Sequence, residues 1–380
     1  MNVFSKLLVF LESFGEYKMI DEKFYDPDPF RLLDLPPKVF EKVLKQMDTI
    51  SVFDLSLLAK RVRHQIQLVD LQYDCIEVHN VGRMKKIIFR RNYKEPELTF
   101  SFDELYYDWG WKIMVGKELV DVRGRKPLES EYCCQSKHFE SAVKNLLDYF
   151  STLFRFHSGY ASIELSQKSN KLRELIDHPI FNSRLVVKLN GNLRPAYNGL
   201  PRLLHDYKNL EGLTVNFHFD RRQFDPKEIF AYNRVCFVDA KFLTRQDLLT
   251  FEFRRLRLIW HRLTGDDVNA FIKHWLTGNN ENLYRLELCT AFGNEIEVED
   301  VIRDLDTKDW HAGQRDGDYL IDTIQSPYTI NAREGYDVRR ADGTLATILF
   351  TKTAFFFLVW RVPFNQESFP NAPFNKAHNL

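Results

Sequence analysis

The sequence is poor in the features that mark secreted or membrane-anchored proteins. It has only 5 cysteines in 380 residues, no Cys-x-x-Cys pair and no Asn-x-Ser/Thr acceptor. An odd number of cysteines without those signals indicates a reducing, intracellular location, cytoplasmic and/or nuclear. The longest apolar run, Ala354 to Trp360, is far shorter than the roughly 20 residues of a membrane-spanning helix. We therefore expect no disulfide framework and no membrane partner.

Net charge and compositional bias are absent as well. The 53 basic residues balance 53 acidic ones, so no overall field draws the chain toward nucleic acid. With 16 glycines and 14 prolines, the chain is neither collagen-like nor of low complexity. The length permits two or more globular domains. We predict a folded protein with no nucleic-acid partner.

Two short patterns partly match a nucleotide-binding loop and a calcium-binding loop, but neither has the required residues at the required positions. Residues Gly110 to Lys117 end in Gly-Lys, but their spacing is wrong for a phosphate-binding loop, and Glu118 stands where a Ser or Thr is needed. Asp304, Asp306 and Asp309 begin like a calcium loop, yet Asp309 occupies the glycine position. We therefore predict no catalytic residues, no cofactor and no metal site, and we expect that the chain is not an enzyme.

Residues 30 to 69 have the pattern of short amphipathic helices. Pro36 and Pro37 stand at a helix entry, where proline is tolerated. The apolar residues that follow share one stripe at helical spacing: Val39, Phe40, Val43, Leu44 and Met47. Ser51 and Asp54 have capping-box spacing and predict the start of a second helical stretch. In that stretch we expect these residues to share a face: Leu55, Leu58, Val62 and Ile66.

Some 40 residues cannot bury all of these side chains among themselves, because units of about that size rarely fold alone. One interpretation is a helical subdomain packed on the rest of the same chain. The other is a surface that meets a partner protein by inserting apolar anchors into a groove. Periodicity alone does not choose between them.

The segment Leu35-Pro36-x-x-Val39-Phe40-x-x-Val43-Leu44-x-x-Met47, followed by Asp54-Leu55-x-Leu57-Leu58-x-Lys60-Arg61, resembles an F-box. Through this motif, substrate receptors dock on the Skp-family adaptor of cullin-RING ubiquitin ligases. Val62 departs from the tryptophan that many members carry after the Lys-Arg pair. The resemblance implies a three-helix fold and adaptor contacts from nine residues: Leu35, Pro36, Val39, Phe40, Val43, Leu44, Leu55, Leu57 and Leu58.

The middle of the chain alternates strand and helix patterns. We predict strands at residues 75–79, 86–91 and 97–102 and a helix at 139–154. Two-step apolar pairs then begin at residues 163, 187, 213, 235, 256 and 286, and four of the five intervals fall within the roughly 20 to 29 residues of leucine-rich repeats. The fold class predicted is α+β or α/β, with an irregular leucine-rich-repeat-like strand–helix solenoid. A compact α/β domain with coincidental spacing is the alternative.

The residue inside each apolar pair faces away from the core, because strand side chains alternate. These residues are Glu164, Lys188, Thr214, Cys236, Arg257 and Glu287. Five of them are our predicted target-binding residues: Glu164, Lys188, Thr214, Arg257 and Glu287. An ordinary solvent-facing strand surface is the alternative interpretation.

A second resemblance covers roughly residues 190 to 290. The stretch 263–279, which includes a capping-box spacing at Thr264 and Asp267, resembles the type-2 F-box-associated domain of a family greatly expanded in nematodes. Residues 336–348 and 355–360 resemble the usual end of those proteins. Asp342-Gly343 predicts a type I′ hairpin, and residues 354–362 a third strand, so the C-terminus is expected to form a β-meander.

These observations divide the chain into an N-terminal extension (1–27), an F-box (28–70), strands with a connecting helix (71–158), a repeat-like domain (159–335), a β-meander (336–362) and a tail (363–380). The resemblances imply a substrate-recognition subunit of an SCF-type cullin-RING ubiquitin ligase. Its implied partners are a Skp-family adaptor, a cullin-RING ligase and an unknown target protein. A protein-interaction module that works outside any ligase is the alternative.

Overall fold

The computed structural model describes residues 32–91, 96–103, 111–115, 118–126, 131–136, 139–164, 176–181, 184–191, 204–207, 210–218, 227–289, 296–312, 314–323 and 327–361. The predicted extension at residues 1–27 and the predicted tail at 363–380 lie outside these ranges, as do Gly110, Gly116 and Lys117 of the rejected loop.

The N-terminal unit holds a short 3₁₀ helix, η1 (Leu32–Asp34), and three α-helices, α2 (Pro37–Gln46), α3 (Thr49–Leu58) and α4 (Lys60–Gln67). Pro37 is the first residue of α2, as the proline pattern predicts. The predicted Ser51–Asp54 cap is wrong. Asp48 caps α3 and accepts a hydrogen bond from the Ser51 amide at 2.8 Å. Ala59 is extended between α3 and α4, so the predicted single apolar face is split between two helices.

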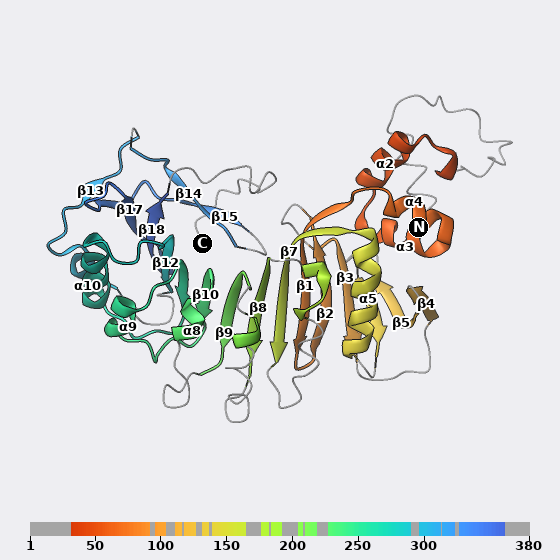
Figure 1. Cartoon of the computed structure of the whole chain (residues 1–380), viewed down its shortest axis with the longest axis horizontal. Coiled ribbons are helices and arrows are strands. Elements are labelled where there is room, and N and C mark those ends of the chain that lie inside the picture. The colour runs from red at the N-terminus through yellow and green to blue at the C-terminus, as the bar shows by residue number, and fades with distance from the viewer. Residues whose placement is uncertain are drawn as a thin grey trace.

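A mixed sheet of 16 strands forms the body of the described chain, in the order β13-β16-β17-β18-β12-β11-β10-β9-β8-β7-β1-β2-β3-β6-β5-β4 (Figure 1). The strands of this sheet are β1 (Gln72–Val81), β2 (Met84–Arg90), β3 (Leu98–Asp103), β4 (Trp111–Val115), β5 (Glu118–Lys126), β6 (Glu131–Gln135), β7 (Arg155–Glu164), β8 (Leu185–Asn190), β9 (Gly212–Asn216), β10 (Arg234–Phe237), β11 (Arg255–Leu258), β12 (Arg285–Cys289), β13 (Lys308–Asp309), β16 (Tyr336–Arg339), β17 (Leu345–Phe350) and β18 (Ala354–Trp360).

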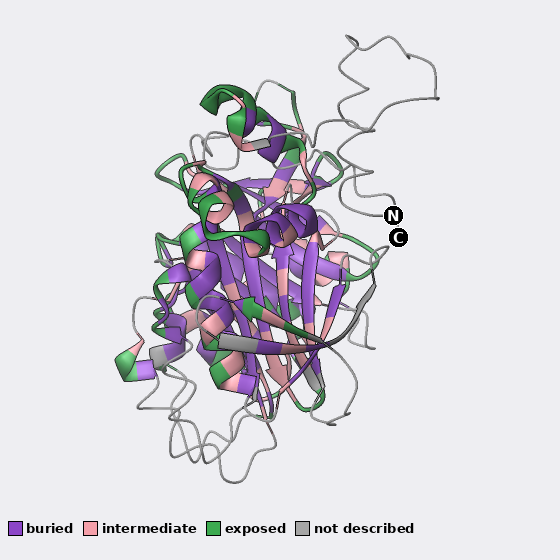
Figure 2. Cartoon of the chain, turned by 90° about the vertical axis from the view of Figure 1, so that its right-hand side faces the viewer, coloured by how far each residue is buried: buried purple, intermediate pink, exposed green. Residues whose placement is uncertain are grey.

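In the described residues between these strands lie five further α-helices and a second 3₁₀ helix: α5 (Phe139–Leu153), η3 (Pro179–Phe181), α8 (Lys227–Phe230), α9 (Arg245–Thr250), α10 (Gly265–Leu276) and α11 (Val298–Ile302). The cap predicted for α10 is confirmed, because Thr264 and Asp267 form a reciprocal capping box. The apolar sides of α5 and α10 join the inward-facing strand residues in one hydrophobic core. Figure 2 shows the strands of the sheet as largely buried.

Seven consecutive neighbours in the sheet, β1 and β7 to β12, are parallel. The last five predicted apolar pairs lie in register across β8 to β12. The first pair is wrong by two residues, because β7 presents Ala161 and Ile163 beside Val187 and Leu189. Glu164 therefore lies beside Asn190, and Ser162 takes the position expected for Glu164 in the row with Lys188.

Beyond these strands the pairing is antiparallel, apart from the parallel pair β3 and β6, so the architecture is a single large mixed sheet carrying the N-terminal helices. At the C-terminal end β16, β17 and β18 form the expected meander, and β18 pairs with β12. Its first turn is not type I′: Gly343 has a φ of +89°, but Asp342 does not have a positive φ. The Gly343 amide instead donates to the Arg340 carbonyl at 2.9 Å.

A two-stranded hairpin, β14 (Asp318–Ile321) and β15 (Tyr328–Asn331), was not predicted. Its apolar residues Tyr319, Ile321 and Ile330 form a second core with Phe356 and Leu358 of β18. The alternating neighbours of these β18 residues, such as Phe357, belong to the main core. The hairpin therefore covers the face of the sheet opposite the helices, at its C-terminal end (Figure 1).

Candidate protein-docking surfaces

The nine residues predicted to contact an adaptor divide by burial. Four of them are at most 8% exposed and lie in the protein's own hydrophobic core or pack around it: Phe40, Val43, Leu44 and Leu55. Phe40, Leu44 and Leu55 belong to the hydrophobic core that the N-terminal helices share with the sheet. These four side chains are buried in the free chain, and their contact with an adaptor stays a prediction.

The other five predicted residues remain at least partly accessible. Leu58 is 68% exposed and Val39 is 43% exposed, which makes them two of the most exposed large apolar side chains in the described chain. Pro36 is exposed, while Leu35 and Leu57 are half-buried and pack against the core. We call these five residues the exposed F-box set. They are the apolar groups that another protein can still bury.

Helix α3 fixes this unit firmly to the sheet. Phe53 is fully buried and makes edge-on ring contacts with Phe100 and Tyr132, at centroid distances of 5.2 and 5.6 Å. Thr49 donates a hydrogen bond to the Tyr73 hydroxyl at 3.1 Å, and burial raises the pKa of Tyr73 to about 12, so the phenol stays neutral. The N-terminal helices and the sheet therefore share one core.

The predicted target-binding row only partly faces solvent. Lys188 and Thr214 are half-buried, and the Arg257 side chain is 46% exposed. The Glu287 side chain is only 4% exposed and pairs with Arg257 Nε at 2.9 Å. The expectation that Glu287 faces solvent is wrong, and its contact instead orients Arg257. For Glu164 the structure gives only the backbone register described above.

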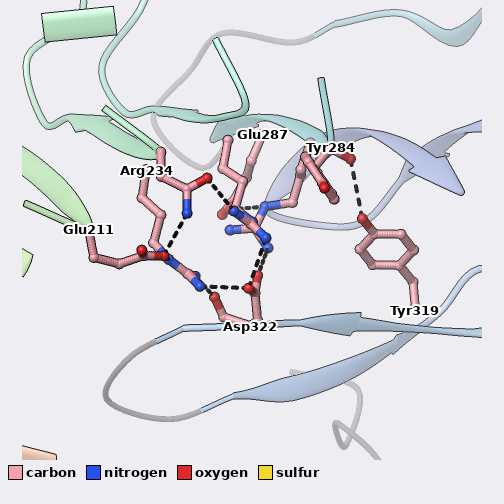
Figure 3. Close-up of polar contacts among 9 residues, drawn as sticks. Glu211, Arg234, Tyr284, Glu287, Tyr319 and Asp322 are labelled. Atoms are coloured by element: carbon pink, nitrogen blue, oxygen red, sulfur yellow. Dashed lines mark hydrogen bonds and ion pairs between the residues drawn. The ribbon is translucent and has the colours of Figure 1, made fainter. Parts of the chain in front are cut away.

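Beside this row lies an arginine ladder. Arg234, Arg255 and Arg285 occupy aligned positions on β10, β11 and β12. Like charges on neighbouring strands repel, so the ladder needs carboxylates close by. Asp322, immediately after β14, supplies one: its Oδ2 lies 2.6 Å from Arg234 Nη2 and 3.3 Å from Arg255 Nη2 (Figure 3).

Further polar groups surround the ladder in Figure 3. Glu211 Oε1 accepts a hydrogen bond from Arg234 Nε at 2.8 Å. The Arg255 guanidinium lies over the Tyr284 ring at 4.6 Å. Burial lowers the pKa of Arg255 below its usual range and Asp322 opposes this effect, whereas Asp322 and Glu211 outweigh burial at Arg234 and raise its pKa.

Sequence reasoning missed the ladder and Asp322, although the sequence carries a signal for the first. Each ladder arginine directly precedes the first apolar residue of a repeated pair: Val235, Leu256 and Leu286. An i, i+2 count along the strands places these arginines on the same face as Arg257. Asp322 has no comparable signal, because its contacts depend on the folded position of the hairpin.

The described residues contain no group of three or more His, Cys, Asp or Glu side chains arranged to hold a metal ion. No helix in the described part of the chain is long and apolar enough to cross a membrane.

Comparison with protein families identifies both resemblances. The F-box domain model matches residues 32–72, and the F-box associated model matches residues 223–288. The chain contains an F-box and an F-box-associated domain. The first covers η1 and α2 to α4, and the second spans α8 to β12, including the three ladder arginines.

Among curated proteins, the chain is similar to two uncharacterized proteins of Caenorhabditis elegans. It is 22% identical to F59B2.9 over 87% of this chain and 79% of that protein, and 22% identical to F59B2.8 over 90% and 79%. It is also 21% identical to the E3 ubiquitin-protein ligase hecw-1 of C. elegans, over 74% of this chain but only 24% of that protein. No solved structure gives a significant match.

Proposed function

We propose that the chain is the substrate-recognition subunit of an SCF-type cullin-RING ubiquitin ligase, with the F-box bound to a Skp-family adaptor. The observation that carries this proposal is the exposed F-box set, which lies on a unit that buried residues such as Leu44 and Phe53 hold against the sheet. Exposed apolar side chains beside a well-packed support are suitable anchors for a partner's groove. The similarity to a protein named as a ubiquitin ligase agrees with this role.

We propose further that the repeat-like parallel stretch β7 to β12 acts as a solenoid-like surface for an unknown target protein. Lys188, Thr214 and Arg257 remain its candidate contacts, with Glu164 at the adjacent register position and Glu287 orienting Arg257. The shared core between α3 and the sheet keeps the adaptor and the target at a fixed separation. Ubiquitin transfer then follows from proximity, with no catalytic group supplied by this chain. We place this activity inside the cell.

The test is recovery of the recombinant adaptor by the full chain and by its Leu35→Ala/Pro36→Ala variant. We expect the double substitution to weaken adaptor binding by about 2 to 4 kcal/mol, or about 30- to 1000-fold. A Lys241→Ala variant, altered on the distant F-box-associated domain, serves as the control. Unchanged recovery by a folded double variant argues against the proposal.

A protein-interaction module outside any ligase remains the second candidate, because it uses the same exposed side chains. The two candidates differ in what co-purifies with the chain. A ligase subunit recovers a cullin together with the adaptor, and it loses both in the Leu35/Pro36 variant. Recovery of the adaptor without a cullin favours the second candidate.

A further inference from the structure

The guanidinium of Arg285 has no hydrogen-bond partner in the described part of the chain, although its side chain is only 9% exposed. Its Nε is fully buried and makes no hydrogen bond, and its carboxylate contacts are long ion pairs. The nearest carboxylate oxygens are Glu287 Oε2, 3.8 Å from Nε, and Asp322 Oδ1, 3.9 Å from Nη1. Both distances are too long for hydrogen bonds.

The two nearby carboxylates are already committed to other arginines. Glu287 pairs with Arg257 at 2.9 Å, and Asp322 pairs with Arg234 at 2.6 Å. Within the described residues of this cluster, four arginines (234, 255, 257 and 285) face three carboxylates (Glu211, Glu287 and Asp322). The cluster therefore carries one positive charge more than its acids neutralise.

A buried charged donor without an acceptor is expensive, and buried polar groups are nearly always paired in native proteins. An added oxyanion removes both problems, because it neutralises the surplus charge and accepts from the Arg285 fork. Guanidinium groups match carboxylate and phosphoryl oxygens with two parallel hydrogen bonds. Arg257 is half-exposed on the neighbouring strand and provides a second donor on the solvent side.

We infer that Arg285 and Arg257 form a binding seat for an oxyanion, a carboxylate or a phosphoryl group. The seat lies inside the match to the F-box-associated domain and on the face of the sheet proposed for target binding. That the anion belongs to a target protein rests on the proposed function. The presence of the seat rests only on the contacts of this cluster.

The first experiment measures binding of inorganic phosphate to the full-length chain by calorimetry, with chloride at matched ionic strength as the reference. Arg285→Gln removes the guanidinium group, and no other described residue loses a hydrogen bond, so we expect the chain to fold. We expect the variant to bind phosphate at least about 10-fold more weakly than the wild type. Arg333→Gln, at a 48% exposed arginine two residues after β15, is the control and is expected to leave binding unchanged. Equal phosphate affinity in the wild type and the Arg285 variant overturns the seat, as does the absence of any phosphate binding to the wild type.

If Arg285→Gln does not fold, Arg257→Lys keeps the charge beside Glu287 but removes the fork. We expect this variant to weaken phosphate binding by about fivefold, again with Arg333→Gln as the control. Full affinity in Arg257→Lys then overturns the inference.

The second experiment identifies the carrier of the anion. Three peptides that differ only in a central serine, glutamate or phosphoserine compete with phosphate for the wild-type chain. Displacement by the glutamate or phosphoserine peptide, but not by the serine peptide, supports a target-borne group. Displacement by none of them shows an adventitious ion only and overturns the assignment to a target. Because adaptor binding is measured separately, loss of the ligase role leaves a positive phosphate result standing.

Discussion

Truncation of two exposed apolar side chains of the F-box, Val39 and Leu58, tests whether this surface binds the adaptor. Full burial of a Val or Leu side chain contributes roughly 1.5 to 3 kcal/mol. Leu58 has 68% of its surface left to bury and Val39 has 43%, so together they can contribute about 1.7 to 3.3 kcal/mol to a complex. Alanine keeps the Cβ atom, so we expect Val39→Ala/Leu58→Ala to weaken adaptor binding by about 1.5 to 2.5 kcal/mol, or about 10- to 70-fold.

The assay is calorimetric titration of the full-length variant with the recombinant adaptor, alongside urea unfolding of the same sample. The free chain should keep most of its stability, with a loss of no more than about 1 kcal/mol, since both side chains are exposed. Leu44→Ala is the matched contrast: Leu44 is fully buried, so this change should cost about 2 to 5 kcal/mol of folding stability. Wild-type adaptor affinity in a folded Val39/Leu58 variant refutes the assignment of this surface.

Three further substitutions test the packing and the ion pairs that stabilise the F-box and the F-box-associated domain. Phe53→Ala should cost about 3 to 5 kcal/mol in urea unfolding, because it empties the ring cluster that joins α3 to the sheet; a smaller loss than that of an exposed apolar residue argues against a shared core. Asp322→Asn should cost about 3 to 5 kcal/mol by leaving buried arginines without their partner, whereas Asp318→Asn, 54% exposed on the same hairpin, should change stability by less than about 1 kcal/mol. Burial raises the pKa of Asp267, but hydrogen bonds from Thr264 and Arg245 outweigh it and hold that pKa below the ordinary 3.8. The ionised Asp267 carboxylate therefore stabilises the folded chain above pH 3.8, and this contribution is lost as the pH falls through the lower folded pKa. The free energy of unfolding of Asp267→Asn should consequently fall less steeply with acid than that of the wild type.

Local sequence signals predicted several elements because short-range chemistry determines them. Proline at the start of α2 and the Thr264–Asp267 box at the start of α10 depend only on groups within one helical turn. The same reasoning failed at α3, where Asp48 and Ser51 are both suitable caps and the structure uses the earlier one. Strand spacing likewise located β8 to β12, because each buried pair alternates with an outward residue.

Strand register and the burial of individual side chains depend on long-range packing, which the sequence pattern did not predict. Parallel register between β7 and β8 is fixed by tertiary contacts, so Glu164 lies at a different position from the one its spacing suggested. Glu287 is buried beside arginines that the spacing rule did not weigh. The F-box motif indicated which apolar side chains belong to the helices, but the division between buried Leu44 and exposed Leu58 depends on how α2 and α3 pack against the rest of the chain.

Hydrogen exchange of the full-length chain, with and without saturating Skp-family adaptor, tests the central claim most directly. We predict that the adaptor slows amide exchange in residues 35–39 and 57–58, where the exposed F-box set lies, and leaves β9 to β11 unchanged. No change in either F-box segment at saturating adaptor contradicts the account, as does protection confined to the sheet.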